Sequence, residues 1–437
     1  MFKNSAKSYA EIRGYLDTIP VIDTHEHYTG YSRYDSIKCF LGYLPKDMLS
    51  ASFDAEEEQR IDRIAYSREP ATDEDYQFLY EVYKRVDKTA YARGLRLGMK
   101  ECWGIAEITP ETFRLFEENY RKNHHEVFDK FAQRHNVKAL IADMMRDDSG
   151  AYIDGHNQDY PEQCRFAFPL PHLHNIHDCD DIMKVAKYCG GGSITCLDDY
   201  LETIENYLKK AVDFGVVCMK DQSAYLRTLE YGNPPRSDAE KIFNSMLLNR
   251  RKIHGSDEHK PLGDWLFNHL MRLARKYSLP VQIHTGYLSG NRGSFVEEAN
   301  AANLAKLLDM HRDVNFDLFH GNWPFMDEYL YIGKSFPNVY LDLCWAQCLD
   351  PLYCIEFMKR ALMTIPHTKI LAYGGDTLSI EMTTGYLIMA KDNVACALSE
   401  LVESGWMDIL QAKEIAADWF FNNPNRLFKL GFEPFVV

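Results

Sequence analysis

Short apolar runs of strand length alternate along the chain with longer segments of amphipathic, helical pattern. Runs this short and this apolar are typical of strands that are buried on both faces of a parallel sheet. We expect eight such strands, at 21–27, 138–144, 165–170, 215–220, 280–286, 315–321, 338–345 and 369–376. Helical patterns are clearest at 197–214, 264–277 and 295–310. The alternation predicts an α/β fold in which the eight strands close into a (β/α)8 barrel.

Two connections are too long for simple crossovers between barrel strands. Residues 28–137 follow the first strand and carry helix-like sequence rich in aromatic and charged residues, which predicts a helical insertion on the active-site side of the barrel. Residues 222–263 form a smaller excursion with the turn-rich sequence YGNPPRS. The run at 165–170 is also compatible with a loop, because of its nearby proline. We expect residues 1–437 to form one barrel domain that carries these additions.

The charge of the chain narrows the range of binding partners. Its formal net charge is −15 over 437 residues, and a nucleic-acid or anionic-membrane surface would need a basic patch instead. The beginning of the chain is polar and amphipathic, without the apolar core of a signal peptide, and the eleven cysteines contain no C-x-x-C pair. We therefore expect a cytoplasmic protein that acts on a small molecule and could also self-associate.

Five of the expected strands end in a residue that can bind a metal ion or transfer a proton. The first ends in the sequence His-Glu-His, and the others end in Lys220, His284, His320 and Asp376. Residues i and i+2 of a strand point to the same side, so His25 and His27 can reach one ion. Functional residues at the carboxyl ends of strands are the arrangement of a barrel active site.

Imidazole and carboxylate ligands suit Zn²⁺ best, with Mn²⁺ or Fe²⁺ as alternatives. Asp376 can bind such an ion and also accept the proton of an activated water, which makes it the candidate general base. His320 could bind a second ion or polarise a substrate carbonyl. Lys220 could be carboxylated and bridge two ions, or it could remain an ammonium group that binds an anionic substrate.

Each of these residues also has an ordinary structural explanation. His25 and His27 could cap a strand end, His284 and His320 could be buried core histidines, and Asp376 follows two glycines in a turn. Tyr225 and Arg227 come just after Lys220 and could hold a substrate carboxylate, although a solvated loop explains them nearly as well. A further histidine group at 172, 174 and 177 lacks matched cysteines, so we do not expect a separate metal site there.

The ordered series of motifs resembles the amidohydrolase superfamily, and within it the amidohydrolase-related branch of metal-dependent TIM-barrel hydrolases. The matching sequences are IDTHEH, MKDQSAYLRTL, VQIHTGY, DLFHGNWPF, FPNVYLDLCWA, YGGDT and NNPNRLFKLG. The resemblance implies that His25, His27, His284 and Asp376 bind the metal, with His320 as a further ligand or a catalytic group. It does not imply a substrate, because the branch contains hydrolases, decarboxylases and sugar-acid isomerases.

We therefore expect a metal-dependent hydrolase that attacks an amide, ester or lactone carbonyl of a small, carboxylate-bearing substrate. A uronate-isomerase-like enzyme is the first alternative, since Lys220 and Arg227 would suit a sugar acid, and a decarboxylase is the next. A binding protein that retains metal without turnover is the alternative from another class. Product analysis with uronates, lactones, esters and N-acyl compounds distinguishes these functions.

Overall fold

Eight parallel strands form one sheet whose order in space is their order along the chain. The computed structural model describes residues 6–27, 52–66, 71–143, 160–249, 256–290 and 295–437. The strands are β1 (Val21–Glu26), β2 (Val137–Asp143), β3 (Cys164–Pro169), β4 (Val216–Asp221), β5 (Val281–Ile283), β6 (Phe316–Leu318), β7 (Val339–Asp342) and β8 (Ile370–Leu371). All eight expected strands are confirmed, including the uncertain third one.

Backbone hydrogen bonds between β1 and the segment after β8 complete the barrel. Thr24 N donates to Tyr373 O at 3.2 Å, and Asp376 N donates to His25 O at 2.8 Å. His27 N donates to Thr377 O at 3.1 Å. The predicted (β/α)8 barrel is therefore confirmed, and its first and last strands lie side by side at the ends that carry the candidate ligands.

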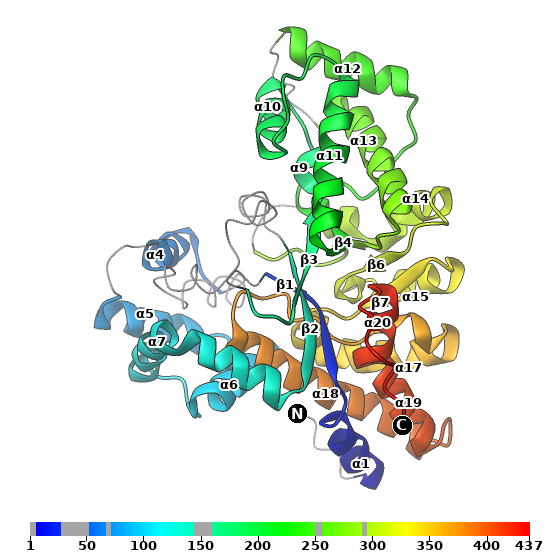
Figure 1. Ribbon diagram of the computed structural model, residues 1–437. Coiled ribbons are helices and arrows are strands. Elements are labelled where there is room, and N and C mark those ends of the chain that lie inside the picture. The colour runs from blue at the N-terminus through cyan, green and yellow to red at the C-terminus, as the bar shows by residue number, and fades with distance from the viewer. Residues whose placement is uncertain (1–5, 28–51, 67–70, 144–159, 250–255, 291–294) are drawn as a thin grey trace.

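Helices surround the barrel and connect its strands (Figure 1). They are α1 (Lys7–Leu16), α9 (Pro171–His174), α10 (Cys179–Tyr188), α11 (Leu197–Phe214), α12 (Arg236–Asn249), α13 (Ser256–Tyr277), α14 (Ala305–Met310), α15 (Met326–Ser335), α16 (Ala346–Leu349), α17 (Pro351–Thr364), α18 (Ile380–Glu403), α19 (Ile409–Ala417) and α20 (Asn423–Leu427). Helix α11 matches its prediction at both ends and stops at Gly215, whose φ of 110° an L side chain rarely adopts. None of the helices in the described ranges is long and apolar enough to cross a membrane.

The helix expected at 295–310 is wrong for most of its length. Two 3₁₀ turns occupy Val296–Ala299 and Ala301–Leu304, and only Ala305–Met310 is α-helical. Asn300 separates the two turns with an extended backbone, and its side chain accepts a hydrogen bond from Ala302 N. Such a local side-chain bond competes with helix formation, which the hydrophobic period alone does not reveal.

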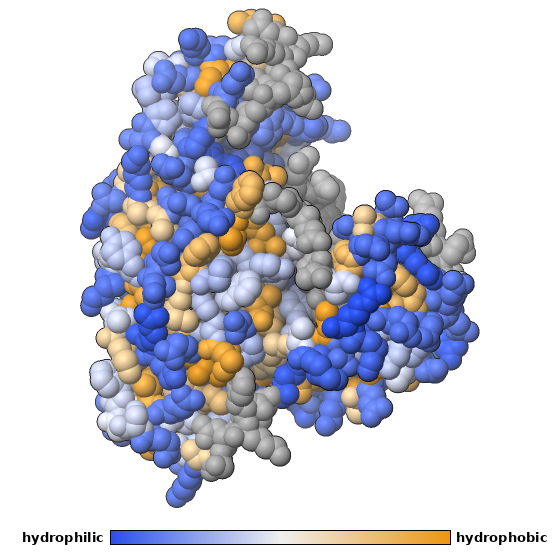
Figure 2. All heavy atoms as spheres, turned by 180° about the vertical axis from the view of Figure 1, so that it is seen from behind, coloured by the Kyte–Doolittle hydropathy of each residue, from blue (hydrophilic) through white to orange (hydrophobic). Residues whose placement is uncertain are grey.

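The barrel interior and the barrel exterior have separate apolar clusters. Inside the barrel, a small cluster joins Ile141, Ala167, Cys218 and Leu371 to Leu427 and Phe428 near the end of the chain. The larger cluster lies between the strands and the surrounding helices. Hydrophilic residues cover most of the face seen in Figure 2, with smaller hydrophobic patches among them.

A helical insertion follows β1, as predicted. Its described helices are α4 (Ala55–Tyr66), α5 (Asp73–Lys84), α6 (Ala90–Trp103) and α7 (Pro110–Arg134), and they lie on one side of the barrel in Figure 1. Helix α6 packs against α18 through glycines on both helices. A Cβ atom at Gly98 would come within 1.7 Å of Glu381 O, and one at Gly385 within 1.9 Å of Gly94 O. The two backbones therefore approach too closely for any side chain at these positions.

Replacing Gly98 with alanine should destabilise the protein by about 1–3 kcal/mol, because the clash is with backbone and the helices must separate. The matched control is Gly14→Ala in α1, where no atom lies within 4 Å of the new Cβ. Glycine in a helix interior costs stability relative to alanine, so this control should be neutral or stabilising by up to about 1 kcal/mol. Urea unfolding measures both variants, and equal stabilities would contradict the close packing of α6 on α18.

Candidate active site

The first two candidate ligands lie at the end of β1. His25 is completely buried, whereas the His27 side chain keeps 31% of its surface exposed. The pairing of β1 with β2 is irregular between Asp23 and Glu26, where the strand register shifts. The two imidazole rings lie with their centroids 5.1 Å apart. Both histidines therefore face the same space at the barrel mouth, as the His-x-His spacing predicted.

Asp376 contacts three of the candidate histidines. Its Oδ1 lies 3.0 Å from His27 Nε2 and 3.6 Å from His25 Nε2, and its Oδ2 lies 3.7 Å from His320 Nε2. Asp376 has a φ of 52°, in the left-handed region. A Cβ atom on the preceding Gly375 would meet Glu26 Oε1 at 1.9 Å. The two glycines of YGGD thus let the chain pass close to β1 and present the carboxylate to the histidines.

His284 and His320 face each other through two nitrogens that carry no proton when both rings are neutral. His320 Nδ1 lies 3.0 Å from Cys344 O, and His284 Nε2 lies 2.8 Å from Tyr287 O. A carbonyl oxygen only accepts hydrogen bonds, so these two nitrogens are the protonated ones. The remaining nitrogens, His320 Nε2 and His284 Nδ1, are 2.9 Å apart. Two lone pairs at this distance repel each other unless a proton lies between them or a metal ion lies beside them.

Burial and neighbouring charges keep most of these side chains in the protonation state that binds a metal ion. Burial, with the nearby charge of Lys220, lowers the pKa of His25 well below its usual value. Burial lowers the pKa of His320 to about 4, and burial and the neighbouring His320 lower that of His284. Burial opposes the charge on Asp376, yet the hydrogen bond and the charge of His27, whose own pKa is raised, hold the pKa of Asp376 well below the usual range. Neutral imidazoles and an ionised carboxylate are the forms that coordinate divalent ions.

These residues fit a divalent transition-metal ion. His25 Nε2 is buried and receives no hydrogen bond from the described residues, although it lies near the Asp376 carboxylate. The facing lone pairs of His284 and His320 point the same way, because burial disfavours a proton on either ring and leaves a metal ion to relieve the repulsion. Nitrogen and oxygen donors of this kind suit Zn²⁺, Mn²⁺ or Fe²⁺.

Asp143 is a candidate ligand that the sequence interpretation missed. It ends β2 and its side chain is buried, with Oδ2 3.9 Å from His27 Nδ1. His25, His27 and Asp143 can bring one ligand atom each within 4.8 Å of one another, as can His320, Cys344 and Asp376. The signal was available, because Asp143 ends an apolar strand just as the recognised residues do.

Lys220 is buried at the end of β4, 2% exposed, with its Nζ 4.3 Å from the centre of the Phe319 ring. Within the described ranges, no carboxylate lies within ion-pair distance of this ammonium group. Lys220 therefore has no salt-bridge partner among the described residues, and its charge acts on the site. The positive charge of Lys220 helps burial to lower the pKa values of His25, His284 and His320.

Tyr225 and Arg227 lie in different surroundings. The Tyr225 ring is 4.7 Å from the His284 ring, and its hydroxyl accepts a hydrogen bond from Ser289 N at 3.1 Å. Arg227 donates from Nη2 to Asp264 and from Nε to Thr228 O. Tyr225 therefore borders the histidines, while the Arg227 guanidinium is largely bound within the excursion. Their roles in substrate binding stay predictions.

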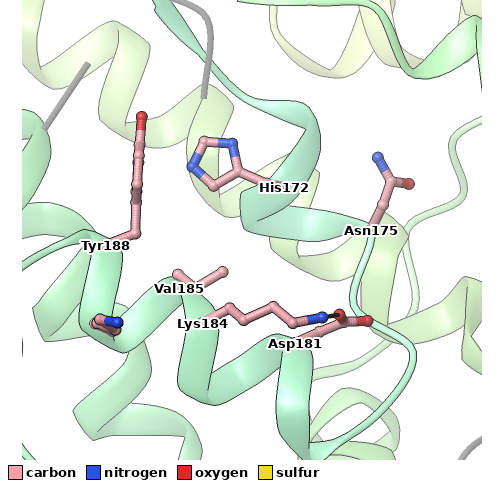
Figure 3. Close-up of a pocket in the computed structure, with 7 residues that line it drawn as sticks. His172, Asn175, Asp181, Lys184, Val185 and Tyr188 are labelled. Atoms are coloured by element: carbon pink, nitrogen blue, oxygen red, sulfur yellow. Dashed lines mark hydrogen bonds and ion pairs between the residues drawn. The ribbon is translucent and has the colours of Figure 1, made fainter. Parts of the chain in front are cut away.

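The histidines at 172, 174 and 177 have three different partners. The His172 ring packs on Tyr188, His174 Nε2 lies 3.0 Å from Asp221 Oδ1, and the His177 ring lies 4.2 Å from that of His259. They do not converge on one ion. His172 and Tyr188 instead border a cavity of about 440 Å³ beside α9 and α10 (Figure 3), which is also lined by Asn175, Asp181, Lys184, Val185 and Lys187.

The amidohydrolase family model matches residues 200–430, more than half of the chain. The fluG protein of Emericella nidulans is 28% identical over 231 residues, which are 51% of this chain and 26% of that protein. The match thus spans about a quarter of the length of this curated relative. The chain belongs to the amidohydrolase family and, with it, to a superfamily of metal-dependent enzymes.

Solved structures resemble the chain over nearly its full length. The uronate isomerase of Thermotoga maritima has a TM-score of 0.75 and 14% identity, with 98% of this chain and 100% of that chain covered. A protein of Lactobacillus casei assigned as a metal-dependent hydrolase has a TM-score of 0.66 and 17% identity, with 96% and 97% covered. At 14% and 17% sequence identity, this structural likeness shows that the chain shares the fold of these proteins and nothing about its reaction.

Proposed function

We propose that this protein is a metal-dependent hydrolase that cleaves an amide, ester or lactone of a small substrate carrying a carboxylate. The observation that supports it most is the position of the Asp376 carboxylate among His25, His27 and His320, at 3.0–3.7 Å from their nitrogens. A carboxylate in this position can both bind an ion and accept a proton from water. The family match supports the same chemistry, because it includes Lys220, His284, His320 and Asp376.

The proposed ligands of the ion are His25, His27, His284 and Asp376, with His320 beside them. His320 Nδ1 donates to the Cys344 carbonyl, so its Nε2 offers a lone pair and not a hydrogen. This tautomer favours His320 as a ligand over His320 as a hydrogen-bond donor to the substrate. Zn²⁺ is the preferred ion in this proposal, and Asp143 is an additional candidate ligand next to His27.

The proton transfers are assigned to Asp376. A divalent ion held by these residues would supply Lewis acidity, which makes the attacking water more acidic, with a pKa towards about 7. Asp376 then accepts the proton of the attacking water and later returns it to the leaving group, so its carboxylate is regenerated in each cycle. Its depressed pKa keeps it ionised, and therefore ready to accept a proton, at neutral pH.

The proposal assigns the substrate carboxylate to Lys220 and Tyr225. Lys220 presents a buried ammonium group that has no carboxylate partner among the described residues, and Tyr225 lies against His284. Arg227 is less suited to direct contact, because Asp264 already holds its guanidinium. A buried cation without a carboxylate partner attracts an anionic group strongly, because the dielectric constant of such a site is low.

A second candidate is the isomerisation of a sugar acid. The full-length fold likeness to a uronate isomerase favours it, and such a substrate also carries a carboxylate for Lys220. In that reaction Asp376 would move a proton between neighbouring carbon atoms of an open-chain sugar. The two candidates share the ion and the proton carrier, and they differ in whether water is consumed.

Purified protein should contain at least about one divalent transition-metal ion per chain, as expected for a histidine and carboxylate site. The double variant His25→Ala/His27→Ala should lose most of this metal, because two ligands that converge on one ion are removed. His367→Ala is the control, since His367 pairs with Asp418 away from the site. Elemental analysis measures all three proteins, and full retention in the double variant would rule out the assignment.

Asp376→Asn should lower kcat by about 10²- to 10⁴-fold, the usual contribution of a positioned proton carrier. Wild type and variant are incubated with N-acyl amino acids, esters, lactones and uronates, and the products are analysed by mass. Products whose masses add up to the substrate plus one water support the hydrolase, whereas a product of unchanged mass from a uronate supports the isomerase. Asp213→Asn, at an exposed ion pair with Lys209, should retain full activity. An Asp376→Asn enzyme with normal kcat would contradict the assigned role.

A further inference from the structure

A layer of polar side chains crosses the barrel interior directly beneath the candidate active site. It consists of Thr24 on β1, Gln282 on β5, Asp317 on β6 and Asp342 on β7, all at most 1% exposed. Strands β1 and β5 face each other across an eight-stranded barrel. Gln282 Nε2 nevertheless donates to Thr24 O at 2.9 Å and to Asp317 Oδ2 at 3.2 Å. The Gln282 amide therefore spans the interior and joins opposite walls of the barrel.

The two carboxyl groups of this layer are neighbours on adjacent strands. Asp317 pairs in register with Tyr340, and Asp342 lies two residues further along β7, on the same side of the strand. Asp342 Oδ1 accepts a hydrogen bond from Cys344 N at 2.7 Å. Burial, and then the charge of Asp317, raise the pKa of Asp342 well above its usual value, while a hydrogen bond from the Thr24 side chain opposes this rise. The two groups thus share one enclosed space.

Three oxygens of this layer accept no hydrogen bond from the described residues. They are Asp317 Oδ1, Asp342 Oδ2 and Gln282 Oε1, and each belongs to a side chain that is 0% exposed. The Gln282 amide is oriented by its two donated bonds, so its oxygen must point elsewhere in the layer. A buried acceptor without a donor costs free energy comparable to a lost hydrogen bond, and here three occur together.

The layer also carries more negative charge than the protein balances. Lys220 on β4 pairs in register with Gln282, and its positive charge lowers the pKa of Asp317, which burial raises. This single positive charge offsets one carboxylate at most. No basic side chain of the described residues forms an ion pair with Asp317 or Asp342. Burying an uncompensated carboxylate is costly, so either a proton or a bound cation must neutralise the remaining charge. A water molecule could donate two hydrogens but would leave the charge in place.

We infer that this layer binds a hard metal cation through the oxygens of Gln282, Asp317 and Asp342. The donor set consists of carboxylate and carboxamide oxygens, which suit Na⁺, K⁺, Mg²⁺ or Ca²⁺. The histidine-rich site above it suits a softer ion, so the two sites take different metals. The cation stabilises the contact between β1 and the strands opposite to it, and this role does not depend on which reaction the enzyme catalyses.

The test separates this site from the histidine site. The His25→Ala/His27→Ala protein is treated with chelator and heated with Na⁺, K⁺, Mg²⁺ or Ca²⁺, with tetramethylammonium chloride holding the ionic strength constant. At least one cation should raise the Tm in a saturable way by about 2 °C or more, because it binds only the folded chain. Adding Asp317→Asn and Asp342→Asn to the same protein should abolish that rise. Asp129→Asn, on the exposed surface of α7, is the matched control and should preserve it.

Elemental analysis of the same proteins completes the experiment. The histidine variant should hold about one equivalent of the stabilising cation, and the added asparagines should remove it. The same measurements are repeated with the asparagine substitutions in the wild-type background, in case the histidine variant does not fold. A Tm unaffected by all four cations, with none of them bound, would show that protons neutralise the layer and would overturn the inference. A cation response that survives both asparagines would overturn it as well. Because two of the proposed catalytic ligands are already removed, and because Tm and bound cation are measured instead of turnover, neither result bears on the proposed hydrolase activity.

Discussion

The backbone contact between the first strand and the segment after the last strand determines the geometry of the whole site. Asp376 N donates to His25 O, and His27 N donates to Thr377 O, so residues 351 and 350 positions apart in the chain become immediate neighbours. Without this closure the Asp376 carboxylate would not reach the histidines of β1. The barrel therefore brings the candidate ligands together, since they come from the ends of several strands and cannot meet locally.

Buried carboxyl groups behind the site reinforce the same contact. Asp23 Oδ1 accepts hydrogen bonds from His25 N and Gly375 N, at 3.2 and 3.1 Å. Glu26, between the two histidines of β1, accepts from Thr377 N at 2.8 Å and from Thr383 Oγ1 at 2.7 Å. These bonds hold β1 to the loop that carries Asp376. Groups of this kind, which orient ligands without touching the ion, contribute strongly to metal affinity in known sites.

Hydrophobic periodicity was sufficient to predict the barrel, because each strand is a short apolar run with a turn after it. The same pattern identified His25, His27, His284, His320 and Asp376 as residues at strand ends. It failed where local hydrogen bonding decides the backbone, as at Asn300, and it overlooked Asp143, whose strand end was recognised but not its carboxylate. The pattern could not predict the contacts of interior polar residues such as Gln282, because their partners lie on strands that are distant in sequence.

X-ray absorption spectroscopy at the metal edge of the loaded protein tests the central claim, that strand-end histidines and Asp376 hold one ion. For Zn²⁺ we predict a shell of nitrogen and oxygen ligands at about 2.0–2.1 Å, with the outer-shell scattering of several imidazole rings. This expectation follows from the facing nitrogens of His284 and His320 and from the position of Asp376 among the histidines. A sulfur shell near about 2.3 Å, as Cys344 would supply, or an oxygen shell without imidazole scattering would contradict the account.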